Sequence, residues 1–292
     1  MRVLLTGGTG FIGDPVARAL RAAGHDVTIV SRHPGYVPAK AIAWDAVAAA
    51  VAETDAVVNL AGEPIAEGRW TPARKAGILA SRVDATRVVV EGLRAAAKRP
   101  GVLVSASAVG FYGPHGDEAL DETAPAGEGF LADVCRQWEA EAFRARDLGV
   151  RVAALRIGVV LGPGGGALAK MLLPFRACLG GPLGSGTQWM SWIHRDDVVG
   201  LVLAALDGAA YAGPVNATAP APARNRDFTR ALARAVHRPA VLPAPAFALR
   251  LALGEMADIL LTGQRVVPAA ATAAGYAFRH PDLDAALAAS ID

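Results

Sequence analysis

The sequence has 292 residues, of which 53% are hydrophobic and 19% are charged, so the chain can bury a large core. The formal net charge is only +2, and no block of like charge occurs, so we expect neither a nucleic-acid partner nor a membrane surface as partner. Gly and Pro interrupt the uncharged stretches before any of them reaches the length of a transmembrane helix.

The first half of the chain alternates predicted strands with predicted helices. Short apolar runs predict buried strands, and longer periodic runs predict helices. We expect strands at 2–5, 27–30, 41–44, 56–60, 102–105 and 150–157, and helices at 11–23, 47–52, 72–97 and 133–148. Apolar strands that alternate with helices are typical of a parallel sheet covered on both faces. The sequence therefore predicts an α/β fold with a doubly wound parallel sheet.

The organisation changes after Gly158, where a glycine-rich loop begins. Helices are expected at 167–178, 196–206 and 225–236, and strands at 188–193 and 215–217. Asp196 and Asp197 are expected to cap and start the middle one of these helices. Several prolines then precede a last segment at about 240–292.

A glycine-rich turn follows the first predicted strand. Gly7, Gly10 and Gly13 are spaced three residues apart, between an apolar strand and the start of a helix. The first glycine permits a tight turn, the second permits close approach of a pyrophosphate, and the third permits close packing of the helix. The N–H groups of such a turn bind anions. The sequence predicts a dinucleotide site that comprises Gly7, Thr9, Gly10, Phe11, Ile12 and Gly13.

The end of the second predicted strand indicates which dinucleotide is bound. An acidic residue at this place would bind the ribose 2′-hydroxyl of NAD. The chain has Ser31 and Arg32 instead. A hydroxyl and a guanidinium suit the 2′-phosphate of NADP by charge and by geometry. We therefore predict NADP(H) as the cofactor.

The cysteines and the N-terminus indicate the environment of the protein. Cys135 and Cys178 are the only cysteines, and they form neither a disulfide framework nor a metal-ligand spacing. The sequence thus predicts no metal site. The N-terminus shows no signal-peptide pattern, and we expect a cytoplasmic location.

These motifs resemble the short-chain dehydrogenase/reductase superfamily in its extended, epimerase-like form. Asn59–Gly62 resembles the Asn-x-Ala-Gly element, Ser105–Ser107 the end of the fifth strand with the catalytic serine, and Leu155–Pro163 the sixth strand with its loop. The resemblance covers the whole chain and implies a Rossmann fold. It implies that the cofactor site also includes Asp45, Leu60, Ala61, Gly62, Glu63, Arg82, Ser105, Ala106 and Arg156.

Further motifs resemble one atypical branch of epimerase-family proteins with a small characteristic C-terminal domain. They are NLAGEPI at 59–65, RWT at 69–71, SR at 81–82, SAVGFYG at 107–113, WE at 138–139, SWIH at 191–194, LLTGQRVVP at 260–268 and GYAF at 275–278. We predict a Rossmann domain at 1–165, to which some later segments return, and a smaller α/β part at 166–292 on the substrate side. The family-specific segment spans about 240–292.

The usual catalytic pair of the superfamily is missing. Ordinary members use Tyr-x-x-x-Lys on the helix after the fifth strand, where the Tyr exchanges a proton and the Lys lowers its pKa. Aligned on Glu139, these positions fall at about Leu131 and Cys135. The one literal match, at 36–40, contains a proline and lies between the second and third strands, so we interpret it as a loop.

Three other side chains are candidates for catalysis. They are Ser107, Tyr112 and His194. Ser107 would hydrogen-bond the substrate oxygen, Tyr112 would exchange a proton, and His194 would face the substrate. Large side chains such as Trp70, Trp189 and Trp192 would either wall a substrate pocket or pack in the core.

We predict an NADP(H)-dependent oxidoreductase that acts on a carbonyl or alcohol of an undefined small-molecule substrate. A non-catalytic NADPH-responsive module is the alternative, because such a protein needs no acid–base pair. A nucleotide-sugar epimerase is the third possibility, although the missing pair and the preference for NADP count against it. The helices at 72–97 and 133–148 often pair between subunits in the superfamily, which makes a homodimer plausible.

Overall fold

The computed structural model describes residues 1–291. A seven-stranded sheet lies at its centre, in the order β11-β7-β5-β4-β1-β2-β3, and all neighbouring strands are parallel. Its strands are β1 (Arg2–Thr6), β2 (Asp26–Val30), β3 (Ala41–Ile42), β4 (Ala56–Asn59), β5 (Val102–Ala108), β7 (Arg151–Ile157) and β11 (Gly213–Ala217). The predicted doubly wound Rossmann sheet is therefore confirmed.

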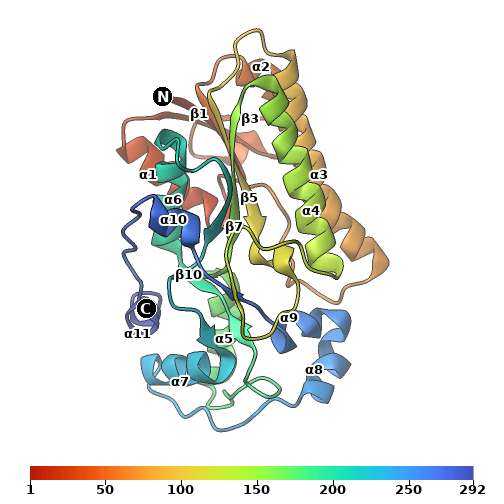
Figure 1. Ribbon diagram of the computed structural model, residues 1–292, viewed down its shortest axis with the longest axis vertical. Helices are drawn as coiled ribbons and strands as arrows, with labels where there is room; N and C mark the ends of the chain where they lie inside the picture. Colours follow the sequence, from red (N-terminus) through yellow and green to blue (C-terminus); the bar gives the residue numbers. More distant parts are fainter. Residues whose placement is uncertain (292) are drawn as a thin grey trace.

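Helices cover both faces of this sheet, which Figure 1 shows nearly edge-on. On one face lie α1 (Gly13–Ala22) and α6 (Arg195–Asp207), and on the other lie α2 (Val47–Val51), α3 (Pro72–Ala95) and α4 (Phe130–Phe143). Val3 and Leu5 belong to the core on the first face, and Leu4, which points the other way, belongs to the core on the second. Burial on both sides explains why the strands read as continuous apolar runs.

The strand order reverses next to β1. The chain runs from β1 outward through β2 to β3, and then returns to the other side of β1 with β4 and β5. In open parallel sheets a ligand binds at such a switch point, outside the carboxyl ends of the strands. The loops after β1 and β4 occupy that place.

A smaller part of the molecule lies beyond the carboxyl ends of these strands, in the lower half of Figure 1. Its core is formed by α5, α7 and α11 around the buried Trp192. Its helices are α5 (Gly166–Arg176), α7 (Asn225–Ala235), α8 (Ala246–Leu253), α9 (Asp258–Leu261) and α11 (Leu283–Ala288). The helix α10 (Ala269–Ala273) lies beside α6 and packs on β11 of the central sheet. Its strands pair as β8 (Val159–Leu161) with β10 (Trp192–His194), β9 (Trp189–Met190) with β12 (Ala223–Arg224), and β6 (Ala119–Leu120) with β13 (Arg265–Val266).

Short 3₁₀ helices join several of these elements. They are η1 (Pro34–Tyr36), η2 (Trp44–Ala46), η3 (Val109–Tyr112), η4 (Arg144–Leu148) and η5 (Gly254–Ala257). The Tyr-x-x-x-Lys match at 36–40 begins at the end of η1, and the Tyr36 side chain is exposed, so this segment is a loop as predicted. None of the helices within residues 1–291 combines the length and apolar character needed to cross a membrane.

Three predicted elements differ from the observed ones by more than two residues at one end or are divided in two. The strand expected at 102–105 extends to Ala108, because β7 offers hydrogen-bonding partners along the whole of β5. The helix expected at 133–148 begins at Phe130, after Gly129 with φ +100°, and continues after Phe143 only as η4. The strand expected at 188–193 is two strands, β9 and β10, which pair in different sheets.

Ser191 separates these two strands. Its hydroxyl donates to the carbonyl of Gln264 (2.7 Å) and accepts from the amide of Val266 (2.9 Å). The break therefore results from a contact with a segment that lies far along the chain.

Candidate functional site

The glycine-rich turn has the geometry that its sequence predicts. Gly7 has φ +68°, and a β-carbon there would lie 2.5 Å from the carbonyl oxygen of Leu60. A β-carbon at Gly13 would lie 2.0 Å from the carbonyl oxygen of Gly7. Thr9 and Gly10 are exposed at the tip of the turn, and Phe11 and Ile12 are half-buried. The backbone of this turn is thus accessible to a ligand at the start of α1.

Hydrogen bonds join this turn to the loop after β4. The Thr6 hydroxyl donates to Asn59 Oδ1 (2.7 Å) and accepts from the amide of Ala61 (3.2 Å). The Asn59 side chain in turn donates to the hydroxyls of Thr86 (2.8 Å) and Ser105 (3.4 Å). The loop at 60–62 therefore lies beside Gly7. One ligand can contact both loops in this arrangement.

The end of β2 completes what we call the candidate cofactor site: residues 7–13, 31–32 and 60–63. Ser31 Oγ accepts from the amide of His33 (3.1 Å). Arg32 is exposed and takes part in no ion pair or side-chain hydrogen bond with residues 1–291. Its guanidinium is therefore available to an anion. Asp45 lies exposed in η2.

Arg82 lies directly beneath the loop after β4. Its guanidinium donates to the carbonyls of Glu63 (2.9 Å) and Ile78 (3.0 Å) and lies over the Trp138 ring, 5.3 Å from its centroid. A β-carbon at Gly62 would lie 3.2 Å from the central carbon of this guanidinium. The loop at 60–63 therefore rests on a fixed positive charge.

Ser107 is held inside a buried network. It lies on β5 and is 3% exposed, and its hydroxyl donates to Glu139 Oε1 on α4 (2.6 Å). Arg156 on β7 donates to both oxygens of the same carboxylate (2.9 Å each). Ser105 and Ala106 precede Ser107 on β5, and both are buried.

Tyr112 belongs to the same network. Its hydroxyl donates to Asn216 Oδ1 (2.6 Å) and accepts from Arg156 (2.9 Å). Tyr112 is fully buried, and burial raises the pKa of its hydroxyl. The guanidinium of Arg156 also lies 3.5 Å from the centroid of the Phe111 ring.

Within this network the hydroxyl of Tyr112 and the guanidinium of Arg156 form hydrogen bonds with other side chains of the protein. The proton-transfer role of Tyr112 and the cofactor contact of Arg156 stay predictions. Asn216 was not found by sequence reasoning, because it lies on β11, far along the chain from Tyr112.

The positions of the missing pair lie on α4 and pack against η3. A β-carbon at Gly110 would lie 3.2 Å from Leu131 Cβ and 3.8 Å from Cys135 Sγ. Burial, and secondarily the Glu139 carboxylate, raises the pKa of the Cys135 thiol to about 12. Cys135 is therefore a neutral thiol near pH 7 and does not supply the charge of the usual Lys. Leu131, at the position of the usual Tyr, has no proton to exchange.

His194, rather than Asp196 or Asp197, caps α6. Its Nδ1 accepts from the amide of Asp196 (3.2 Å), and the helix begins at Arg195. The backbone of His194 is still extended, which is the conformation of an N-cap residue, whereas the two aspartates already lie in the first turn. The sequence expectation for the cap was therefore wrong.

The surroundings of His194 keep it neutral. Burial, and then the adjacent His280, lower the pKa of His194 below its usual range. Its Nε2 is buried and has no hydrogen-bond partner within residues 1–291. The catalytic role of His194 stays a prediction.

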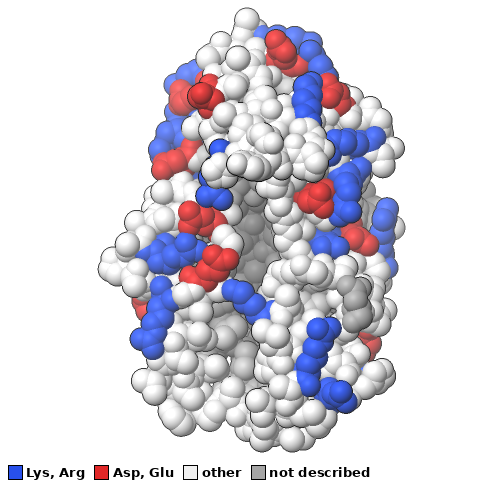
Figure 2. All heavy atoms as spheres, turned by 180° about the vertical axis from the view of Figure 1, so that it is seen from behind, with Lys and Arg blue, Asp and Glu red and all other residues white. Residues whose placement is uncertain are grey.

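A strap formed by residues 62–71 connects the two parts of the molecule. Arg69 donates to the carbonyls of Leu251 and Ala252, and Lys170 donates to the carbonyl of Ala66. These hydrogen bonds hold the strap against α8 and α5. Figure 2 shows that the face seen from behind is hollowed by a groove along its middle.

A polar cavity of about 550 Å³ lies further from the glycine-rich turn, between the loop at 114–118, β9 and the segment 261–263. Trp189 Nε1 and Arg224 both donate to Asp117 Oδ1 (2.9 and 2.7 Å), and these hydrogen bonds hold the pKa of Asp117 below its usual range. The sequence singled out Trp189 but not its partners, because they come from separate segments. Trp192 packs in the core, and Trp70 packs edge-on against Phe130.

Two family models match the chain. A model described as the NAD dependent epimerase/dehydratase family matches residues 3–216. A model of DUF1731, a domain of unknown function, matches residues 244–290. The first match includes the central sheet and the candidate cofactor site, and the second includes α8 to α11.

The chain is also similar to individual proteins along its whole length. It is 44% identical to the epimerase family protein SDR39U1 homolog, chloroplastic, of Arabidopsis thaliana, over 99% of this chain and 86% of that protein. The crystal structure of the human epimerase family protein SDR39U1 (isoform 2) with NADPH matches with a TM-score of 0.92 and 40% identity, over 99% and 98% of the two chains. A nucleoside-diphosphate sugar epimerase from Corynebacterium glutamicum matches with a TM-score of 0.81 and 35% identity, over 99% of this chain and 58% of that one.

Proposed function

Because the chain belongs to the NAD dependent epimerase/dehydratase family, we propose that it binds NADP(H) and transfers hydride to or from a carbonyl or alcohol carbon. The observation that carries the proposal is the exposed glycine-rich turn beside the free guanidinium of Arg32. The presence of NADPH in the structure of the human relative supports it.

Each part of the candidate cofactor site has a role in this proposal. The turn at 7–13 offers backbone N–H groups and the start of α1 to the pyrophosphate. Ser31 and Arg32 bind the 2′-phosphate, because a guanidinium forms paired, charge-assisted hydrogen bonds with phosphate oxygens. The loop at 60–63 borders the adenine side. When bound, the cofactor supplies or accepts the hydride.

Ser107 is the side chain that we propose to contact the substrate oxygen. Its own proton is donated to Glu139 Oε1, so toward a substrate it acts as an acceptor in this arrangement. An alcohol that donates to Ser107 therefore fits better than a carbonyl that needs a donor. Without the Tyr and Lys of ordinary members, we expect slow turnover.

A non-catalytic NADPH-responsive module is favoured by one specific observation. Ser107, Tyr112, Glu139 and Arg156 satisfy one another within the buried network. Such a network has a structural role, and none of its side chains is identified as the proton donor of a reaction. A protein of this kind would bind NADPH and signal its presence to a partner.

The first experiment titrates the purified chain with NADPH and NADH. We expect wild type to prefer NADPH, and Arg32→Ala to weaken NADPH binding by about 10- to 100-fold, since a hydrogen bond to a charged group contributes about 1.5–3 kcal/mol. NADH binding should not change. Arg18→Ala, which removes an exposed arginine of α1, is the control. Equal affinities of wild type for both nucleotides would refute the role of Arg32.

A second experiment separates the catalytic proposal from the sensor. Oxidation of NADPH is followed with a panel of aldehydes and ketones, reduction of NADP⁺ with alcohols, and epimerisation with nucleotide sugars. A reaction that Ser107→Ala slows at unchanged NADPH affinity supports the oxidoreductase. Tight NADPH binding without turnover of any compound supports the sensor, and turnover of a nucleotide sugar alone supports an epimerase.

A further inference from the structure

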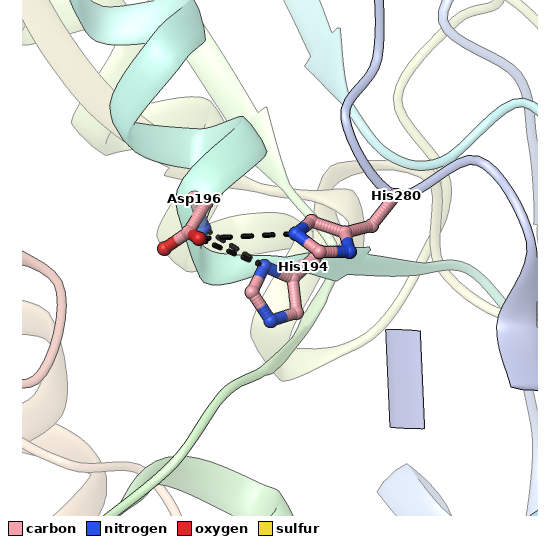
Figure 3. Close-up of side chains that lie close together, drawn as sticks. All are labelled: His194, Asp196 and His280. Atoms are coloured by element: carbon pink, nitrogen blue, oxygen red, sulfur yellow. Dashed lines mark hydrogen bonds and ion pairs between the residues drawn. The ribbon is translucent and has the colours of Figure 1, made fainter. Parts of the chain in front are cut away.

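Three metal-ligating side chains converge at the start of α6, outside the candidate cofactor site. Figure 3 shows His194 at the end of β10, Asp196 in the first turn of α6, and His280 from the C-terminal segment. One ligand atom of each lies within 4.8 Å of the other two. The segments meet here although His280 lies far along the chain from the other two residues.

The distances leave a gap that is suited to an ion. His194 Nδ1 and His280 Nε2 each lie 3.8 Å from the same carboxylate oxygen, Asp196 Oδ2. These separations are too long for hydrogen bonds. Ligands of a tetrahedral ion with bonds of about 2.1 Å lie about 3.4 Å apart. Each imidazole nitrogen is therefore only a few tenths of an ångström too far from the carboxylate oxygen, and all three ligand atoms lie within 4.8 Å of one another.

The backbone around His280 is fixed by a buried carboxylate. Asp197 accepts from the amides of Arg279 (2.7 Å) and His280 (3.0 Å), and the Tyr276 hydroxyl donates to the carbonyl of Asp197 (3.1 Å). Asp197 is fully buried. The two imidazole rings lie with their centroids 3.9 Å apart. The ligand set is thus positioned by its surroundings, as in established metal sites.

The electrostatics and access of the site also suit a cation. The start of a helix repels positive charge, but the carboxylates of Asp196 and Asp197 offset this effect. The nearby Arg195 is turned away, because its guanidinium donates to the carbonyl of Pro163 and lies over the Phe11 ring. Asp196 is 47% exposed and His280 is 22% exposed, so an ion can enter from solvent.

We propose that His194, Asp196 and His280 bind one divalent transition-metal ion, of which Zn²⁺ is the representative. Two imidazoles and one carboxylate suit Zn²⁺, Ni²⁺, Co²⁺ or Cu²⁺ rather than Mg²⁺ or Ca²⁺. Coordination by His194 Nδ1 replaces the hydrogen bond that this atom accepts from Asp196. The ion links the C-terminal segment to α6 and keeps a coordination position for water.

The test is equilibrium dialysis and calorimetry of the tag-free full chain after treatment with EDTA. We expect one Zn²⁺ per chain at micromolar free metal, no binding of Mg²⁺ at the same concentration, and a melting temperature that rises with Zn²⁺ because the ion binds only the folded state. Failure of wild type to bind Zn²⁺ at about 100 μM free metal would overturn the proposal.

Variants assign the ion to these side chains. We expect His280→Ala and Asp196→Asn each to weaken Zn²⁺ binding by more than about 100-fold. Loss of a residue that only hydrogen-bonds a metal ligand typically weakens metal binding by about 10- to 100-fold. Both side chains are partly exposed, so the variants should melt like wild type in EDTA. His115→Ala is the control, because His115 pairs with Glu118 elsewhere on the surface. Zn²⁺ binding that survives in His280→Ala, or disappears in His115→Ala, would refute the assignment.

Discussion

A β-carbon at Gly13 would lie 2.0 Å from the carbonyl oxygen of Gly7, which belongs to the backbone of the turn. At Gly7 the positive φ adds a second restriction, because L side chains rarely adopt it. Neither contact can be relieved by a side-chain rotation. These residues therefore fix the path of the chain between β1 and α1, where the cofactor is proposed to bind.

Gly13→Ala tests this restriction. We expect the variant to lose about 1–3 kcal/mol of stability, which is typical of overpacking, and to bind NADPH at least about tenfold more weakly because the turn moves. The measurements are urea unfolding and NADPH titration. Gly101→Ala is the control, since a β-carbon there meets nothing within 4 Å. An alanine at position 13 with unchanged NADPH affinity would contradict the proposed cofactor site.

At the scale of elements, α4 is joined to the sheet by one buried ion pair. Glu139 on α4 contacts Ser107 on β5 and Arg156 on β7, and the side chains of the pair are only 4–5% exposed. An exposed ion pair, Glu91 with Arg144, instead joins α3 to η4, the 3₁₀ helix that follows α4. The homodimer expected through α3 and α4 stays a prediction.

Glu139→Gln should be strongly destabilising. The variant leaves the Arg156 charge buried without its partner, which typically costs about 3–5 kcal/mol. Glu91→Gln, in the exposed pair, should cost at most about 1 kcal/mol. The double variant Glu139→Leu/Arg156→Met should recover part of the loss, because it removes both charges. Urea unfolding followed by circular dichroism measures all three, and a loss below about 1 kcal/mol in Glu139→Gln would contradict this account.

At the scale of the whole molecule, the two parts are interleaved. The strand β11 and the helix α6 return to the central sheet after the chain has passed through α5 and β10. The C-terminal segment then docks on α6 through Asp197. The strap at 62–71 makes a further connection through Arg69. Polar contacts of the buried Asp197 carboxylate and of the strap thus join segments that lie far apart in the chain.

Asp197→Ala should release the C-terminal segment. The amides of Arg279 and His280 would lose their buried acceptor, and an unsatisfied group costs up to about 1–3 kcal/mol. We expect faster proteolysis around residues 276–282 and a lower unfolding midpoint in urea. Asp207→Ala, at the exposed end of the same helix, should behave like wild type. Equal proteolysis of both variants would show that other contacts hold the segment.

The sequence by itself determined the order of the main elements, the α/β class and the glycine-rich turn. These features depend on short-range physics: apolar runs specify buried strands, and the spacing of Gly7, Gly10 and Gly13 specifies a turn within a few residues. The prediction of NADP(H) rather than NAD(H) likewise follows from local charge, because Arg32 stands where an acidic residue would bind the ribose of NAD. For the same reason the loop nature of the segment at 36–40 could be predicted from its proline.

Only the tertiary structure decided which side chains meet. The contacts of Ser107 with Glu139 and of Tyr112 with Asn216 join segments far apart in the chain. The approach of His280 to His194 and Asp196 does so too, and their spacing indicates no metal site. His194 caps α6 because the strand β10 ends where that helix begins. Such contacts are set by the packing of the whole chain, which no local pattern of residues encodes.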